Sequence, residues 1–190
     1  IINSIASWLM KKRIHQIELF MKYPFDVQQE WFEKLITSGA ETAWGRKQGF
    51  ESVKTADDFR KKIPVQDYES LKPYIDQMRR GKENILWPGE VNWFAKSSGT
   101  TSDKSKFIPV STEAIEECHY KGALDLLSAY SFLKEDTKIF SGKGLIIGGS
   151  HQVNSFNQST SYGDLSAVLL QNMSIFAHLY RTPQLSIALM

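Results

Sequence analysis

A run of ten residues, from Ser97 to Lys106, combines hydroxyl side chains with one glycine and two lysines. Short apolar segments flank it at 91–95 and 107–110. Apolar segments of this length on both sides of a polar stretch predict two strands joined by a loop at 97–106. Such a loop brings backbone N–H, hydroxyl and ammonium groups into one small volume, which is what a polyphosphate group requires. The sequence therefore predicts a phosphate-binding loop between two antiparallel strands.

Two common glycine motifs for nucleotides do not match this chain. The pattern G-x-x-x-x-G-K-[ST] is absent, and the loop leads into a strand-like segment where that motif leads into a helix. Gly142, Gly144 and Gly148 approach the dinucleotide fingerprint, but the third glycine comes one residue late because Ile147 occupies its position. These two classes of nucleotide site are therefore excluded.

The loop resembles the phosphate loop of adenylate-forming enzymes, whose core reads Ser/Thr-Ser/Thr-Gly-Thr/Ser-Thr/Ser-Gly-x-Pro-Lys. Here Ser102 replaces the second glycine, no proline precedes the lysine, and Lys106 falls one residue later. The longer spacing resembles one branch, the auxin-responsive acyl-acid amido synthetases, which form the Gretchen Hagen family of plants and its bacterial relatives. Three further segments resemble parts of the same family: 63–75, 85–89 and 163–167.

The resemblance implies a layered α/β domain of the adenylate-forming type, which the alternation of helices with short apolar segments also favours. Residues 1–190 would form the N-terminal part of the large adenylating domain, with its remainder and a small domain outside this chain. The family uses ATP and Mg²⁺ to activate a small carboxylic acid as an acyl-adenylate, and then transfers the acyl group to an amino acid. The family's later motifs for adenine, ribose and the α-phosphate find no match here, so we expect the segment alone to be inactive. The alternative is a non-enzymatic α/β interaction module that retains the loop as a relic.

By family position, the resemblance assigns phosphate binding to six residues of the loop: Ser97, Ser98, Gly99, Thr100, Thr101 and Lys106. Lys106 is the expected catalytic residue, because a flexible ammonium can neutralise the pyrophosphate leaving group. Ser102 and Asp103 depart from the general adenylating loop and are possible pocket residues. The negative charge of Asp103 would either repel phosphate or recruit Mg²⁺.

Two further candidates, Ser150 and His151, follow an apolar run at 144–149. Loops after strands carry function in α/β folds, so these residues are also possible pocket residues. No pair among the four histidines has zinc-ligand spacing, and no carboxylate pattern indicates a dedicated metal cage. We therefore predict no metal site formed by the protein alone.

The composition excludes several classes of partner. The net charge is +2 and the basic residues are interspersed with acidic ones, which argues against a nucleic-acid partner. No apolar run approaches the roughly 18 residues that a membrane span needs. Cys118 is the only cysteine, which excludes an intrachain disulfide and is consistent with a cytoplasmic location. A helix over 2–22 could lie on a membrane surface, but Glu18 and the few basic residues favour packing on the body of the protein.

Local signals predict the remaining elements. Asp26 is expected to cap a helix that ends at Gly39, and its apolar face is expected to lie in the core: Trp31, Phe32, Leu35 and Ile36. The other expected elements are a loop around Gly45 and Gly49, a short helix from Thr55 or Asp57 to Lys62, a helix from Tyr68 to Arg80 capped by Asp67, a long helix capped by Ser111 or Thr112, a buried strand at 144–149 and a helix at 163–180. The chain ends in an apolar stretch at 185–190 without a terminating signal, so it looks cut.

Overall fold

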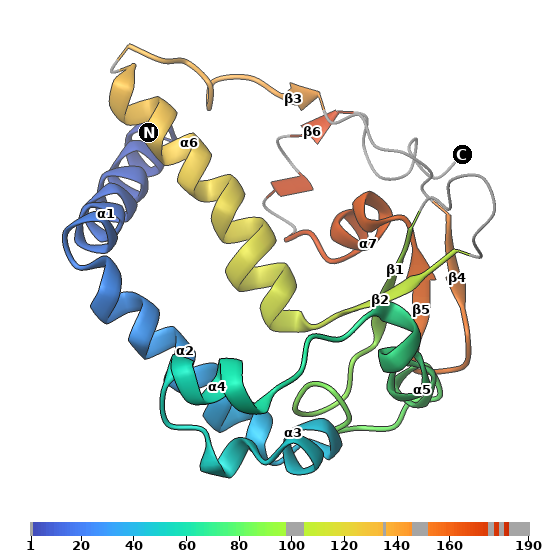
Figure 1. Ribbon diagram of the computed structural model, residues 1–190. Coiled ribbons are helices and arrows are strands. Elements are labelled where there is room, and N and C mark those ends of the chain that lie inside the picture. The colour runs from blue at the N-terminus through green and yellow to red at the C-terminus, as the bar shows by residue number, and fades with distance from the viewer. Residues whose placement is uncertain are drawn as a thin grey trace.

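A computed structural model describes residues 2–97, 105–134, 136–145, 152–174, 177–178 and 181–182 (Figure 1). Helices dominate its first half, and the strands follow from residue 93 onwards. In chain order the elements are α1 (Ile2–Lys22), α2 (Pro24–Ala40), α3 (Ala43–Gln48), the 3₁₀ turn η1 (Phe50–Ser52), α4 (Ala56–Lys62), α5 (Tyr68–Arg79), β1 (Trp93–Lys96), β2 (Phe107–Val110), the π-type helix η2 (Ala114–Tyr120), α6 (Lys121–Leu133), β3 (Gly144–Leu145), β4 (Val153–Ser155), β5 (Ser161–Gly163), α7 (Leu165–Gln171) and β6 (Arg181–Thr182).

The main sheet has four strands in the order β2-β1-β5-β4. β1 is antiparallel to β2, with Trp93 opposite Val110 and Lys96 opposite Phe107. β1 is parallel to β5, while β4 and β5 are antiparallel, so the sheet is mixed. Parallel neighbours need a long crossover, and the chain between β1 and β5 includes η2 and α6. This arrangement confirms the predicted α/β class.

The two faces of β1 bury against different helices, because successive strand residues point to opposite sides of a sheet. Phe94 is fully buried in a cluster with Ile75 and Met78 of α5. Complete burial of a phenylalanine contributes about 1.5–3 kcal/mol. On the other face, Val110 of β2 and Val168 of α7 belong to a second cluster that also contains residues of η2. The sheet is therefore layered between α5 on one side and α7 with η2 on the other.

Arg79, at the C-terminus of α5, ties this helix to the sheet. Its guanidinium carbon lies 4.0 Å from the ring centroid of Phe156 and 4.4 Å from that of Phe107. Its Nη1 donates to Asp76 Oδ1 at 2.8 Å, and its carbonyl oxygen accepts from Thr160 Oγ1 at 2.7 Å. The Arg79 side chain therefore packs α5 against the strands.

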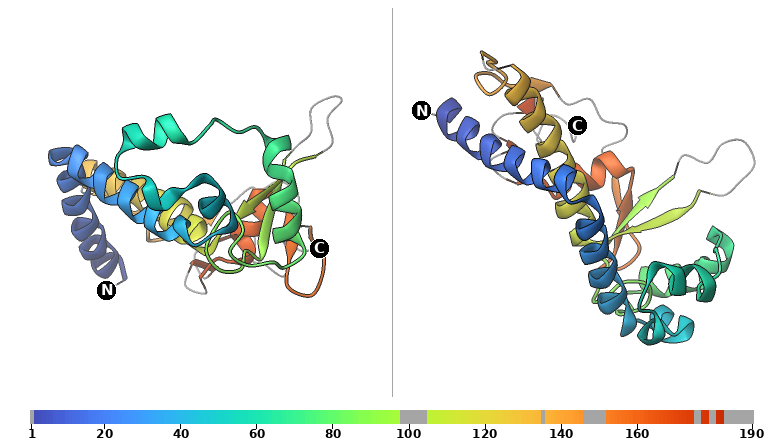
Figure 2. Two further views of the ribbon diagram at one scale, coloured as in Figure 1. Left: turned by 60° about the horizontal axis from the view of Figure 1, so that its bottom comes forward. Right: turned by 60° about the vertical axis from the view of Figure 1, so that its left-hand side comes forward.

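The helix α1 packs beside α6, which the views of Figure 2 also show. Arg13 is buried and forms an ion pair with Asp125, with Nη2 donating to Oδ2 at 2.9 Å. Ser128 Oγ donates to Met10 Sδ at 3.0 Å. These contacts confirm that the first helix packs on the body of the protein. No helix in the described ranges is both long and apolar enough to cross a membrane.

Several predicted helix starts are confirmed by side-chain hydrogen bonds. At α4, Thr55 Oγ1 accepts from Asp58 N at 3.1 Å and Asp58 Oδ2 accepts from Thr55 N at 3.0 Å, which completes a capping box. At α5, Asp67 Oδ1 accepts from Ser70 N at 2.8 Å. Ser111 Oγ is likewise an acceptor at the start of the long helix formed by η2 and α6.

Two predictions near the N-terminus are wrong. Asp26 lies in the first turn of α2 and Tyr23 occupies the cap position, because Pro24 fits the first helical turn. Gly45 lies inside α3, where a loop was predicted. The reason is tertiary: a Cβ at Gly45 would lie 2.0 Å from the carbonyl oxygen of Gly39, so this close approach of two helices requires glycine.

Two predictions near the C-terminus are also wrong. The described part of the predicted buried strand is β3, in which Leu145 is 67% exposed; residues 146–149 lie outside the described ranges. The predicted helix at 163–180 is shorter, because α7 ends at Gln171. At this end of the helix, Asn172 N donates to the carbonyl oxygen of Val168 at 3.2 Å, and Asn172 Nδ2 donates to the same oxygen at 2.8 Å.

We expect Gly45→Ala to lower the free energy of unfolding by about 2 kcal/mol or more, because the methyl group would overlap a backbone carbonyl. Gly122→Ala is the matched control, since no atom lies within 4 Å of its added Cβ. Alanine is favoured over glycine inside a helix by about 0.5–1 kcal/mol, so this variant should be slightly stabilised. Urea unfolding followed by circular dichroism measures both. Equal stability of the two variants would contradict the packing of α3.

Candidate functional site

Ser97 and Lys106 close the hairpin at the base of the predicted phosphate loop. Ser97 N donates to Lys106 O at 2.9 Å, and Lys106 N donates to Ser97 Oγ at 3.1 Å. The antiparallel strands predicted on both sides are confirmed. The other predicted site residues lie outside the described ranges: Ser98, Gly99, Thr100, Thr101, Ser102, Asp103, Ser150 and His151.

The half-buried side chain of Lys106 lies against the start of α5. Its Nζ is 5.5 Å from the ring centroid of Tyr68, whose Oη accepts from Phe107 N at 3.0 Å. Hydrogen bonds from Ser70 lower the pKa of the neighbouring Asp67, and the charge of Lys106 adds to this effect. Lys106 forms no ion pair with any residue that the structure describes. Among the described residues, no carboxylate therefore lies within ion-pair distance of its ammonium.

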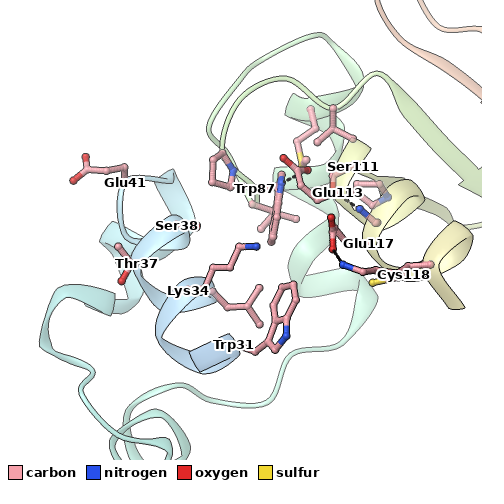
Figure 3. A pocket seen from close by; sticks show the side chains of 18 of the residues that line it. Trp31, Lys34, Thr37, Ser38, Glu41, Trp87, Ser111, Glu113, Glu117 and Cys118 are labelled. Atoms are coloured by element: carbon pink, nitrogen blue, oxygen red, sulfur yellow. Dashed lines mark hydrogen bonds and ion pairs between the residues drawn. The ribbon is translucent and has the colours of Figure 1, made fainter. Parts of the chain in front are cut away.

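A cavity of about 1090 Å³ lies between α2, the segment 86–91 and η2 (Figure 3). Its apolar lining comes from separate segments: Trp31, Leu35, Leu86, Trp87, Pro88, Val91 and Pro109. Figure 3 shows Lys34 reaching between Trp31 and Trp87. Its Nζ lies 4.4 Å from the ring centroid of Trp31. Two tryptophan side chains therefore line the cavity, and the ammonium group of Lys34 lies beside them.

Two carboxylates also face the cavity, Glu113 directly before η2 and Glu117 within it. Glu113 Oε2 accepts from Trp87 Nε1 at 2.9 Å. Partial burial favours the neutral form of Glu113, but hydrogen bonds from its own N–H, from Ser111 and from Trp87, together with the charge of Lys34, outweigh this and lower its pKa. The pKa of Glu117 is also lowered, mainly by the hydrogen bond from Lys121 and further by the positive charge of the same lysine. Both carboxylates are therefore ionised at neutral pH.

The position of Trp87 follows from the contacts of its segment with α3. Ala43 N donates to Asn84 O at 2.8 Å, and Trp44 N donates to Ile85 O at 3.0 Å. Asn84 has a φ of 55°, and its Oδ1 accepts from the N–H of Gly89 at 2.8 Å. A small polar side chain that bonds to nearby backbone is one of the few that tolerate this conformation. The turn so formed carries Trp87 to the cavity.

The prediction that Trp31 and Leu35 belong to the core is wrong, since they are 40% and 45% exposed and line the cavity. Sequence reasoning also did not single out Trp87 or Glu113. An apolar helix face has the same periodicity whether it is covered or lines a cavity, so the pattern holds no signal that separates the two.

A family model described as "GH3 family N-terminal domain" matches residues 13–190. The chain belongs to the GH3 family. This confirms the resemblance to the Gretchen Hagen family that the loop and its flanking segments indicate.

Relatives in this family share about a quarter of their residues with the chain where the two align. JAR4, a jasmonoyl–L-amino acid synthetase of Nicotiana attenuata, is 25% identical over 142 residues, which are 73% of this chain and 24% of the relative. GH3.5 of Oryza sativa subsp. japonica, also a jasmonoyl–L-amino acid synthetase, is 27% identical over 75% of this chain and 24% of the relative. GH3.6 of Arabidopsis thaliana, an indole-3-acetic acid-amido synthetase, is 26% identical over 56% of this chain and 18% of the relative. The chain thus spans a quarter or less of the length of these relatives.

Solved GH3 structures have the same fold over this part. AtGH3.15 acyl acid amido synthetase in complex with 2,4-DB matches with a TM-score of 0.73 and 20% identity, covering 86% of this chain and 28% of that chain. Another structure of GH3.15 acyl acid amido synthetase matches with a TM-score of 0.63 and 23% identity, covering 79% of this chain and 27% of that chain. The described helices and mixed sheet are therefore those of a GH3 protein.

In this GH3 chain, the cavity and the loop lie at opposite ends of the β1–β2 hairpin. Val91 and Pro109 line the cavity, whereas Ser97 and Lys106 close the loop. At 3.3 Å per residue, Val91 and Ser97 are roughly 20 Å apart along the strand. On β2 the separation is shorter, because Pro109 follows Lys106 by three residues, or roughly 10 Å. In the part of the chain that the structure describes, no three His, Cys, Asp or Glu side chains gather to hold a metal ion.

Trp87→Phe should raise the pKa of Glu113, because phenylalanine cannot donate the Nε1 hydrogen bond. A carboxylate whose pKa is lowered by folding stabilises the protein above its unfolded pKa, and this contribution is lost as the pH falls. Because Glu113 is exposed and water screens its interactions, we expect a loss of only a few tenths of a kcal/mol at neutral pH that diminishes as the pH falls below the unfolded pKa. Urea unfolding at neutral pH and at a pH below the unfolded pKa measures this. Trp31→Phe changes the same cavity without touching Glu113, so an equal pH dependence in that control would contradict the assignment.

Proposed function

We propose that this chain is part of an ATP-dependent acyl-acid amido synthetase, a ligase that forms an acyl-adenylate from a small carboxylic acid and transfers the acyl group to an amino acid. The observation that carries the proposal is the β1–β2 hairpin, whose base joins Ser97 to Lys106 in a chain of the GH3 family. Relatives named as jasmonoyl–amino acid and indole-3-acetic acid-amido synthetases support this substrate class. The single cysteine favours action in the cytoplasm.

We place residues 1–190 in the N-terminal part of a large adenylating domain. The family model is that of a GH3 N-terminal domain, and the relatives are about four times as long as the aligned part. The phosphate loop would then act together with groups elsewhere in the protein that hold the adenine, the ribose and the acid.

The described base of the loop fits a phosphate group. Lys106 offers an ammonium, and Ser97 Oγ already accepts from the N–H of Lys106, so its O–H proton remains as a donor. The role proposed for Lys106 is to neutralise charge that develops on the pyrophosphate as it leaves. By family position, Ser98, Gly99, Thr100 and Thr101 would add donors to the same phosphates. Mg²⁺ usually binds through substrate phosphates and few protein ligands, so we propose that it arrives with ATP.

Lys106→Ala in the full-length protein should lower the rate of ATP–pyrophosphate exchange about 30- to 10³-fold, because removal of such a donor costs about 2–4 kcal/mol of transition-state stabilisation. Binding of the acid, measured by calorimetry, should change little. Lys47→Ala is the control, because Lys47 also lies over a tyrosine of α5 but outside the loop. Unchanged exchange in Lys106→Ala would refute the role of Lys106. A wild-type protein without exchange activity would favour the non-enzymatic interaction module.

We expect residues 1–190 alone not to form acyl-adenylate at a measurable rate. A loop that holds only the β- and γ-phosphates leaves the α-phosphorus unoriented against the carboxylate. Orientation contributes on the order of 7–11 kcal/mol in well-positioned reactions, so its loss would remove most of the catalysis. Pyrophosphate exchange by the segment and by the full-length protein decides this, with circular dichroism to show that the segment is folded. Comparable rates would mean that the nucleotide site lies within this chain.

A further inference from the structure

Tyr68 contacts the base of the loop through both parts of its side chain. Its Oη accepts from Phe107 N at 3.0 Å, and its ring centroid lies 5.5 Å from Lys106 Nζ. Tyr68 is the first residue of α5 and packs against the core cluster that contains Ile75 and Phe94. One ring on a fixed helix therefore determines both where β2 begins and where the Lys106 ammonium lies.

Asp67 is the nearby carboxylate whose pKa the charge of Lys106 helps to lower, and one of its two oxygens is engaged at the start of α5. Asp67 Oδ1 accepts from Ser70 N at 2.8 Å, as the cap of α5. Lys106 forms no ion pair within the described ranges. Among the described residues, the ammonium is thus held over an aromatic face and has no carboxylate in an ion pair with it.

We propose that Tyr68 is a positioning residue, which holds the Lys106 ammonium beside the loop for a phosphate while its hydroxyl fixes the backbone at Phe107. The inference rests on the proposed function, which gives Lys106 its role at the pyrophosphate. A lysine has many rotamers, so the ring contact reduces the freedom that would be lost on binding phosphate. A ring face attracts a cation less strongly than a phosphate does, so the ammonium can leave the ring when nucleotide binds.

The same helix provides a matched control in Tyr74. Lys47 Nζ lies 5.2 Å from the ring centroid of Tyr74 and donates to its Oη at 2.8 Å. Tyr74 is also half-buried against the same core cluster. Removal of either tyrosine side chain deletes a contact between its ring and a lysine and a hydrogen bond of its hydroxyl. Of the two, only Tyr68 contacts the base of the loop.

The first test is a double-mutant cycle in the full-length protein, measured as kcat/KM for MgATP in pyrophosphate exchange. Tyr68→Leu should lower kcat/KM on the order of tenfold in the wild-type background. In a Lys106→Met background the same substitution should lower kcat/KM less than about twofold. Tyr68→Phe keeps the ring and should recover most of the loss. Tyr74→Leu should have the same small effect in both backgrounds. A loss for Tyr68→Leu that is equal in the two backgrounds shows a merely structural role and overturns the proposal.

The second test does not depend on activity. With ¹³C-labelled lysine, the ε-CH₂ protons of Lys106 should show an upfield ring-current shift in the wild type and in Tyr68→Phe. This shift should disappear in Tyr68→Leu and persist in Tyr74→Leu. An unshifted Lys106 signal in the wild type overturns the proposal. If the full-length protein shows no exchange, the proposed function fails, and this measurement still decides whether Tyr68 positions Lys106.

Discussion

Strand β1 has a neighbour on every side, and the position of the candidate site depends on these contacts. It pairs with β2 along one edge and with β5 along the other. Phe94 is buried under α5, while Trp93 and Ala95 pack against the cluster of η2 and α7. A shift of β1 by one residue would turn Phe94 to the wrong face, so its register is strongly fixed. Because Ser97 directly follows β1, the same register determines where the loop begins.

Helix α5 fixes the position of the residues on the other side of the loop. Both of its ends contact Phe107, the first residue of β2: Tyr68 through the N–H group and Arg79 through the ring. Phe107 also packs edge-on against Phe156 and Tyr162, with ring centroids 5.1 Å apart in each pair. Lys106 immediately precedes this anchored residue. The lysine is therefore presented from a rigid backbone, whereas its side chain remains able to move.

Sequence reasoning was accurate for most of the local chemistry, although it placed the cap of α2 at Asp26 and not at Tyr23. The cap of α4 by Thr55, the cap of α5 by Asp67 and the strands that flank the loop each follow from a few adjacent residues. It failed where residues far apart in the chain meet. Trp31 and Trp87 form one cavity only because α3 holds the segment of Trp87 in place, and no periodicity within either segment records that. For the loop, the residue types indicate phosphate chemistry, but the contact of Lys106 with an aromatic ring depends on the packing of α5.

The nature of the contact to Lys106 has a consequence for phosphate binding. A cation over an aromatic ring gains about 0.5–1 kcal/mol at a partly exposed site, whereas a hydrogen bond between charged groups contributes about 1.5–3 kcal/mol. A phosphate can therefore displace the ring of Tyr68 at little cost. An ion pair with Asp67 would have to break first, and the released carboxylate would then repel the phosphate. Ser70 engages one oxygen of Asp67 at the cap of α5, and Lys106 forms no ion pair with any described residue, so no described ion pair has to break when a phosphate binds at the base of the loop.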